Sequence, residues 1–141
     1  AWKNTNKITT ITHSFENAYD NNGKVHTYIF YDFPNQKYVY YGFRTGADLI
    51  LENSLSAICP TCNTINWKDI DAVTCTGGNR NEDFYYFFDF DGQKMYILNR
   101  INKNTNNPSF QLNNLPIDLK DAFFNEFGSN NGNELPFDFS K

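Results

Sequence analysis

The sequence predicts a mainly β fold (α+β), in the form of a single curved antiparallel sheet or half-barrel with one or two short helices. Two observations lead to this prediction. Short runs rich in β-branched and aromatic residues alternate along the chain with Gly, Pro, Asn and Asp clusters that are typical of turns. The 141 residues include 14 Phe and 9 Tyr but one Met, so the core must be built from aromatic rings.

The expected elements follow in order along the chain. Residues 7–15 (KITTITHSF) form a strand, the Asn-Gly pair at 22–23 turns the chain, and residues 24–33 return as a second strand. Residues 45–58 fit either a strand or a short helix capped by Asp48, and a strand is preferred. The apolar spacing of residues 117–127 fits a short helix packed on a sheet. The remaining expected strands are residues 37–43, 70–76, 84–90, 94–101 and 109–115.

These elements are expected to form one domain, at residues 1–127. A chain of this size buries about 68–70% of its unfolded surface, which is enough for a core without staples. Residues 128–141 are expected to be a C-terminal tail that is either flexible or docked.

Two aromatic hairpins of the sequence resemble each other. Residues 28–41 (YIFYDFPNQKYVYY) align without gaps on residues 85–98 (YYFFDFDGQKMYIL). Two explanations stay open, a duplication as in a blade repeat, or convergence, because tight hairpins favour similar turn residues. The identical pairs are Tyr28/Tyr85, Phe30/Phe87, Asp32/Asp89, Phe33/Phe90, Gln36/Gln93 and Lys37/Lys94.

The three cysteines allow several interpretations. A thioredoxin-like C-x-x-C motif needs a βαβ unit, which the sequence does not predict, and a structural zinc site needs four ligands. We therefore expect one disulfide, either Cys62–Cys75 or Cys59–Cys75, that ties a loop to the following strand. Such a bond indicates an oxidising compartment. The third cysteine is then expected to stay reduced or to pair between chains.

Composition and motifs argue against most other functions. The net charge of −4 and the scattered basic residues give no footprint for nucleic acid, and no apolar run is long enough for a transmembrane helix. His13 and Ser14 are adjacent in a strand, so their side chains point to opposite faces. Asp32 and Asp89 are better explained as hairpin residues than as an acid–base pair. We therefore expect no enzyme activity, metal or cofactor.

The remaining feature is that both faces of each aromatic hairpin are apolar. One face is expected to form the core and the other a cavity wall for an apolar or amphipathic small molecule or lipid. The alternatives are an aromatic subunit interface in an extracellular assembly, including a homo-oligomer, or a core with two sides. We expect a secreted, non-enzymatic binding domain whose ligand wall consists of Tyr28, Phe30, Tyr38, Tyr40, Tyr85, Phe87 and Tyr96.

The order of these segments resembles the secreted ependymin-related group. The likeness rests on a long strand that ends in Tyr31-Asp32, a turn with Asn35 and Lys37, and a downstream Cys59 or Cys62. It implies a curved half-barrel shared with bacterial lipoprotein carriers, a hydrophobic cavity on its concave face, an extracellular location and dimers. The chain differs from vertebrate ependymins in having fewer cysteines.

A second resemblance is to the hemopexin blade. The Asp71-Ala72 strand followed by the aromatic hairpin at 84–98 is similar to one blade, and residues 11–15 with 28–41 are similar to another. Two blades do not close a propeller, so this resemblance implies either dimerisation or a truncated chain.

Overall fold

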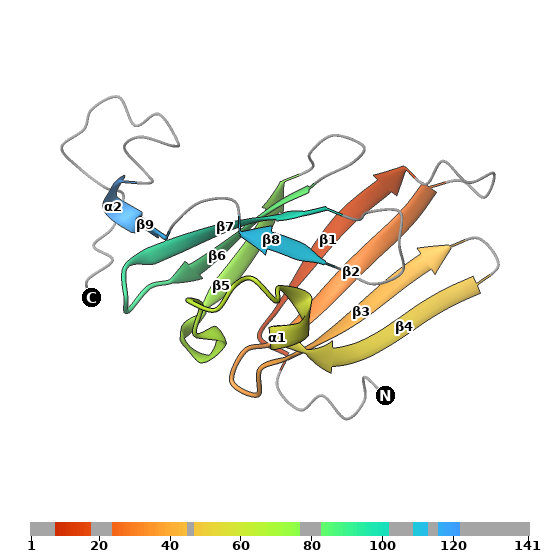
Figure 1. Cartoon of the computed structure of the whole chain (residues 1–141). Helices are drawn as coiled ribbons and strands as arrows, with labels where there is room; N and C mark the ends of the chain where they lie inside the picture. Colours follow the sequence, from red (N-terminus) through yellow and green to blue (C-terminus); the bar gives the residue numbers. More distant parts are fainter. Residues whose placement is uncertain are drawn as a thin grey trace.

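The first four strands form one antiparallel sheet, sheet A, in the order in which they occur along the chain (Figure 1). They are β1 (Thr10–Asn17), β2 (Lys24–Asp32), β3 (Lys37–Arg44) and β4 (Ala47–Ser54). The computed structural model describes residues 8–17, 24–44, 47–76, 83–101, 109–112 and 116–121.

The later strands form a second antiparallel sheet, sheet B. Its path runs β5-β6-β7-β8, and β9 also pairs with β7, so β8 and β9 share one neighbour. The strands are β5 (Ala72–Thr76), β6 (Asp83–Asp89), β7 (Lys94–Arg100), β8 (Phe110–Leu112) and β9 (Ile117–Asp118). A single helical turn, α2 (Leu119–Asp121), follows β9.

Two short helical segments separate the sheets along the chain. The strand preferred for residues 45–58 ends at Ser54, and one helical turn, α1 (Leu55–Ile58), follows it. The hydroxyl of Ser54 caps this turn by accepting a hydrogen bond from the Ser56 backbone N–H at 3.3 Å. A 3-10 turn, η2 (Trp67–Asp69), then leads the chain into β5.

The prediction of a mainly β fold with one or two short helices is confirmed. Among the described residues, the strands belong to two sheets, which do not close into a barrel. The segment between β4 and β5 explains the division, because it forms α1 and η2 instead of another hairpin. The helix expected over 117–127 begins as β9 and continues as α2. Its remainder, and the tail expected at 128–141, lie outside the described residues.

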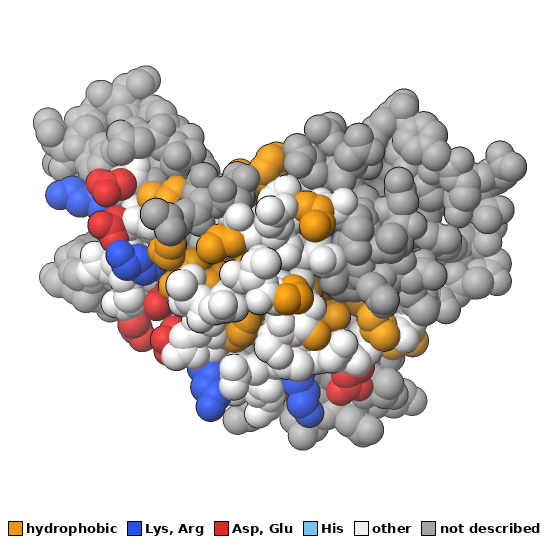
Figure 2. All heavy atoms as spheres, in the orientation of Figure 1, with side chains coloured by type: hydrophobic (Ala, Val, Ile, Leu, Met, Phe, Trp, Pro, Cys, Tyr) orange, Lys and Arg blue, Asp and Glu red, His pale blue; other side chains and the backbone are white. Residues whose placement is uncertain are grey.

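The main core lies between the two sheets. Sheet A and sheet B each contribute one face, β1 lies beside β5, and side chains from α1, η2 and the loop between them complete the cluster (Figure 1). The rings of Tyr31, Trp67 and Phe110 surround Phe87, with centroid distances of 5.7, 5.4 and 6.5 Å to its ring. In the face shown in Figure 2, hydrophobic side chains reach the surface mid-view, and charged side chains follow the left and lower rim.

The two aromatic hairpins have the same strand register. Along β2 and β3 the facing pairs run from His26–Phe43 to Asp32–Lys37, and along β6 and β7 from Asp83–Arg100 to Asp89–Lys94. Every pair of the first hairpin therefore coincides with a pair of the second after a shift of 57 residues. The likeness read from the sequence is also a likeness of structure.

The turns of the two hairpins are alike as well. Gln36 and Gln93 have positive φ angles of 55° and 54°, a left-handed conformation that residues other than glycine seldom adopt. In both turns the aspartate at the end of the first strand accepts a backbone hydrogen bond. Asp32 accepts from Asn35 at 3.2 Å, and Asp89 accepts from Gly92 at 2.8 Å.

The similarity extends to the helical turn behind each hairpin. The Leu55 N–H donates to the carbonyl oxygen of Gln36 at 2.8 Å, and the Leu119 N–H donates to that of Gln93 at 2.9 Å. We therefore describe β1–β4 with α1 as unit 1 and β5–β9 with α2 as unit 2. Residues at equivalent places in the two units are called counterparts.

Candidate functional site

The seven residues predicted to form a ligand wall do not share one face. Five of them, Tyr38, Tyr40, Tyr85, Phe87 and Tyr96, are at most 8% exposed and belong to the core between the sheets. The other two lie on the opposite face of sheet A and are half-buried. The register explains the correction, because Tyr28 faces Tyr41 and Phe30 faces Val39, so neither shares a face with Tyr38 or Tyr40.

The residues predicted for the wall pack against other side chains of the core. Phe87 is fully buried and meets Phe33 edge to face at 6.3 Å, and Tyr85 lies 4.6 Å from the ring of Phe110. Edge-to-face and tilted pairs at these distances are favourable aromatic contacts. The contact of Phe87 with Phe33 joins sheet B to the end of β2 in sheet A, whereas the contact of Tyr85 with Phe110 lies within sheet B.

A row of hydroxyl groups lies in the core at the side of β1. The hydroxyls of Thr12 and Tyr31 are 3.0 Å apart, and those of Ser14 and Thr27 are 2.6 Å apart. Burial raises the pKa of Tyr31 far above its ordinary value, although the hydrogen bond with Thr12 opposes that shift. Burial likewise raises the pKa of Tyr85, against an opposing hydrogen bond from Ser14. Both phenols therefore stay protonated at neutral pH.

One charged pair of residues is buried beside this row. Arg100 on β7 and Asp83 on β6 face each other in the register and are 0% and 1% exposed. The guanidinium of Arg100 also lies 5.4 Å from the ring centre of Tyr40 on sheet A, a cation–π contact between the sheets. Arg100 was expected to be one of several scattered basic residues. The alternation of Tyr96, Leu98 and Arg100 on one face is the signal in the sequence that places it in the core.

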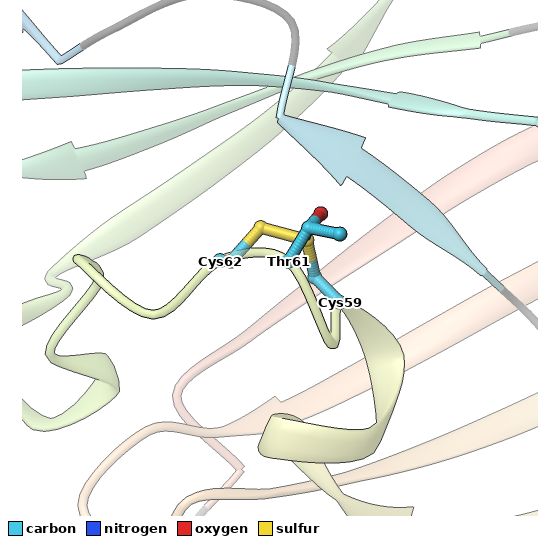
Figure 3. Close-up of a disulfide and its surroundings, with 3 residues drawn as sticks. All are labelled: Cys59, Thr61 and Cys62. Atoms are coloured by element: carbon cyan, nitrogen blue, oxygen red, sulfur yellow. A yellow bond between two sulfur atoms is a disulfide. The ribbon is translucent and has the colours of Figure 1, made fainter.

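The disulfide joins Cys59 and Cys62, which lie in the loop after α1 (Figure 3). The Cys62 N–H donates to the Cys59 carbonyl oxygen at 3.0 Å, and this tight turn brings the two Cα atoms to 5.3 Å. The predicted pairing of Cys75 with either residue is therefore corrected. Cys75 keeps its thiol on β5, where its sulfur lies 3.8 Å from the carbonyl oxygen of Thr76.

The outer face of sheet A is an apolar surface that is exposed only in part, since Val39 on it is 1% exposed. The ring of Tyr28 stacks on His13 at 4.7 Å and lies 6.4 and 6.5 Å from the rings of Tyr41 and Phe30. The side chains of Ile11 and Ile50 are 51% and 44% exposed. We call this surface the back face of sheet A. It consists of Ile11, His13, Tyr28, Phe30, Val39, Tyr41, Ile50 and Glu52.

Sheet B also has an outer apolar face, which is partly covered. Met95 and Ile97 are buried there together with Leu119 of α2, while a row of three aromatic side chains on β6 is half-buried. An ion pair of 2.6 Å between Lys94 and Asp118 fastens β9 beside this cluster. We call this surface the front face of sheet B. It consists of Thr74, Thr76, Phe84, Tyr86, Phe88, Met95, Ile97 and Asn99.

Within the described part of the chain, no three His, Cys, Asp or Glu side chains are grouped so that they could hold a metal ion. No helix among the described residues is long and apolar enough to cross a membrane.

The chain was compared with models of known protein families, with curated proteins and with solved structures, and no match was found. The resemblances to the ependymin-related group and to hemopexin blades therefore stay predictions.

Proposed function

We propose that this chain is a non-enzymatic interaction module that binds a protein partner in an extracellular assembly through a partly exposed aromatic sheet face. The observation that carries the proposal is the back face of sheet A, where Tyr28, Phe30 and Tyr41 form a cluster of rings. Aromatic residues are enriched at protein interfaces, and aromatic side chains there often contribute strongly to binding.

An apolar ligand held between the sheets is the weaker alternative. To admit a ligand there, the sheets would have to separate at Tyr85 and Phe87, which are 1% and 0% exposed. Re-exposing each such ring costs about 1.5–3 kcal/mol before the ligand makes any contact. An apolar small molecule or lipid would bind with less disruption on the back face of sheet A, which also suits a protein partner.

The proposed location outside the cell is supported by the disulfide. A bond between Cys59 and Cys62 persists in oxidising compartments and is rare in the reducing cytosol. An oxidising compartment is also where the proposed extracellular assembly would form.

The test is native mass spectrometry of the tagged chain purified from its own source. We expect a complex with protein, and we expect Ile11→Glu to dissociate it, because the new carboxylate would be buried without a partner. Ile11 is 51% exposed, so the substitution leaves the fold intact. Asn63→Glu adds the same charge on the exposed disulfide loop and should leave the complex unchanged. A monomer carrying lipid, unaffected by Ile11→Glu, contradicts the proposal.

A further inference from the structure

We propose that the partner is a second copy of this chain, bound head to tail. In this contact, the back face of sheet A of one copy packs on the front face of sheet B of the next. The inference rests on the proposed function, because it names the partner of the same surface.

The two units within one chain already meet head to tail. Sheet A contributes Tyr31 and Tyr40 to the core between the sheets. Their counterparts in unit 2 are Phe88 and Ile97, which lie on the outer face of sheet B. The units therefore meet through two different faces, as in a heterologous interface.

The core face of sheet B likewise has its counterpart on the outer face of sheet A. Sheet B contributes Phe87 and Leu98 to the core, and their counterparts in unit 1 are Phe30 and Tyr41, which are half-buried on the back face of sheet A. The back face of sheet A is thus the counterpart of the core face of sheet B, and the front face of sheet B is the counterpart of the core face of sheet A. Because the two core faces pack on each other within the chain, the two outer faces are expected to fit each other between chains.

Exposure at counterpart positions agrees with this assignment. Ile11 faces Phe30 in the register, as Val73 faces Phe87, yet Ile11 is 51% exposed and Val73 is 8% exposed. On the other side, Thr12 faces Ile29 as Thr74 faces Tyr86. Thr12 is 4% exposed in the core, whereas Thr74 is exposed. A head-to-tail contact would bury Ile11 as Val73 is buried in the core, and it would bury Thr74 as Thr12 is buried there.

The helical turns leave the same part of each face available. Leu55 of α1 is packed in the cluster that includes Tyr38, and Leu119 of α2 is packed with Met95, the counterpart of Tyr38. In unit 1, sheet B covers the rest of the core face of sheet A. The equivalent part of unit 2 is the half-buried aromatic row of β6 on the front face of sheet B. We therefore expect a second copy to bind to this row.

A head-to-tail contact uses different surfaces on the two partners, so it repeats from copy to copy. It forms a ring where the rotation closes and an open filament where it does not.

The experiment uses two variants that each block one face. Ile11→Glu places a charge on the back face, and Thr74→Glu places one on the front face. Both positions are exposed, so both variants should fold. Circular dichroism of each variant checks this. Sedimentation velocity is measured over a concentration series for wild type, each variant and their equimolar mixture. Asn63→Glu again serves as the charge control.

We expect wild type and Asn63→Glu to form larger species as concentration rises, and each face variant alone to stay monomeric. A buried carboxylate without a partner should weaken the contact by more than about a hundredfold. The mixture should form a dimer and nothing larger, because one intact back face meets one intact front face.

Two results overturn the proposal. If Thr74→Glu alone still dimerises while Ile11→Glu does not, the back faces pair with each other; head-to-tail binding then fails although the proposed function stands. If wild type stays monomeric at every concentration, the partner is not a second copy. The complex purified from the natural source then decides the proposed function separately.

Discussion

Phe30 and Phe87 are counterparts in the two hairpins, but their surroundings differ. Phe87 is fully buried against four aromatic rings, so Phe87→Ala should lower the free energy of unfolding by about 3–5 kcal/mol. Phe30 is half-buried on the back face, and Phe30→Ala should cost about 1 kcal/mol. Urea denaturation of the two variants measures the difference. Equal losses of unfolding free energy in the two variants would mean that Phe30 on the back face of sheet A is as deeply buried as Phe87 in the core.

The state of the cysteines gives a second prediction for single residues. Denatured protein should show one titratable thiol per chain, on Cys75, because Cys59 and Cys62 are bonded to each other. Peptide mapping should recover Cys59 and Cys62 as one linked peptide. Reduction should lower stability by about 2 kcal/mol, the loop-closure value for so short a loop. Three titratable thiols would remove the argument for an oxidising compartment.

At the residue scale, the sequence predicted which side chains share a face only in part. Tyr85, Phe87 and Tyr96 were expected together and lie together. Tyr28 was assigned to the same wall as Tyr38, but the two point to opposite faces. Alternation tells which residues of one strand share a face. When both faces are apolar, it does not tell which face is inside, and that depends on the other sheet.

The hairpin turns are the elements whose chemistry can be tested most directly. A Cβ added to Gly92 would run into the carboxylate of Asp89, which accepts the Gly92 N–H. Gly92→Ala should therefore lower the free energy of unfolding by about 1 kcal/mol. Asn35 is the counterpart of Gly92, and its side-chain amide donates to Asp32 at 2.9 Å.

The first hairpin thus supplies the matched variant for this test. Gly92→Asn should lose less stability than Gly92→Ala, since its amide can donate to Asp89 as Asn35 does to Asp32. Thermal unfolding of the two variants beside wild type measures the order. Equal stability of the Ala and Asn variants would show that the two turns are not interchangeable.

At the element scale, local patterns predicted the strands and hairpins well. The turn between β2 and β3 and the turn between β6 and β7 were both expected from their Pro, Asn, Asp and Gly residues. The division into two sheets was not expected, because it depends on the segment between β4 and β5. Cys59 and Cys62 close a tight turn there, while Leu55 and Trp67 enter the core. These are tertiary contacts that no periodicity reveals.

For the whole molecule, the aromatic strand β6 has two kinds of surroundings. Its inner residues, such as Phe87, join the sheets, and its outer residues, such as Phe88, pack with the smaller cluster around Met95. The lack of alternation in this strand is therefore explained by a core on one side and a proposed contact surface on the other. The sequence left those two roles open, because both require the same residue types.

The buried tyrosines predict how the stability of the whole fold depends on pH. Burial raises the pKa values of Tyr31, Tyr38 and Tyr85 above 10.0, their value in the unfolded chain. Above pH 10 the unfolded chain therefore loses protons that the folded chain keeps. These three groups should leave stability unchanged below that pH. Above it, Tyr31 and Tyr85 should each lower the free energy of unfolding by about 1.4 kcal/mol per pH unit until the folded protein ionises as well, and Tyr38 should act in the same direction.

Tyr31→Phe isolates one of these protons. At neutral pH it should lower the free energy of unfolding by about 1 kcal/mol, because the hydroxyl of Thr12 loses its contact with Tyr31. Above pH 10 its stability should fall less steeply than that of wild type, by the slope of one tyrosine. Urea midpoints across a pH series, followed beside tyrosinate absorbance, measure both effects. Parallel curves for the two proteins, or ionisation of Tyr31 in the folded state near pH 10, would contradict its burial and with it the packing of sheet A on sheet B.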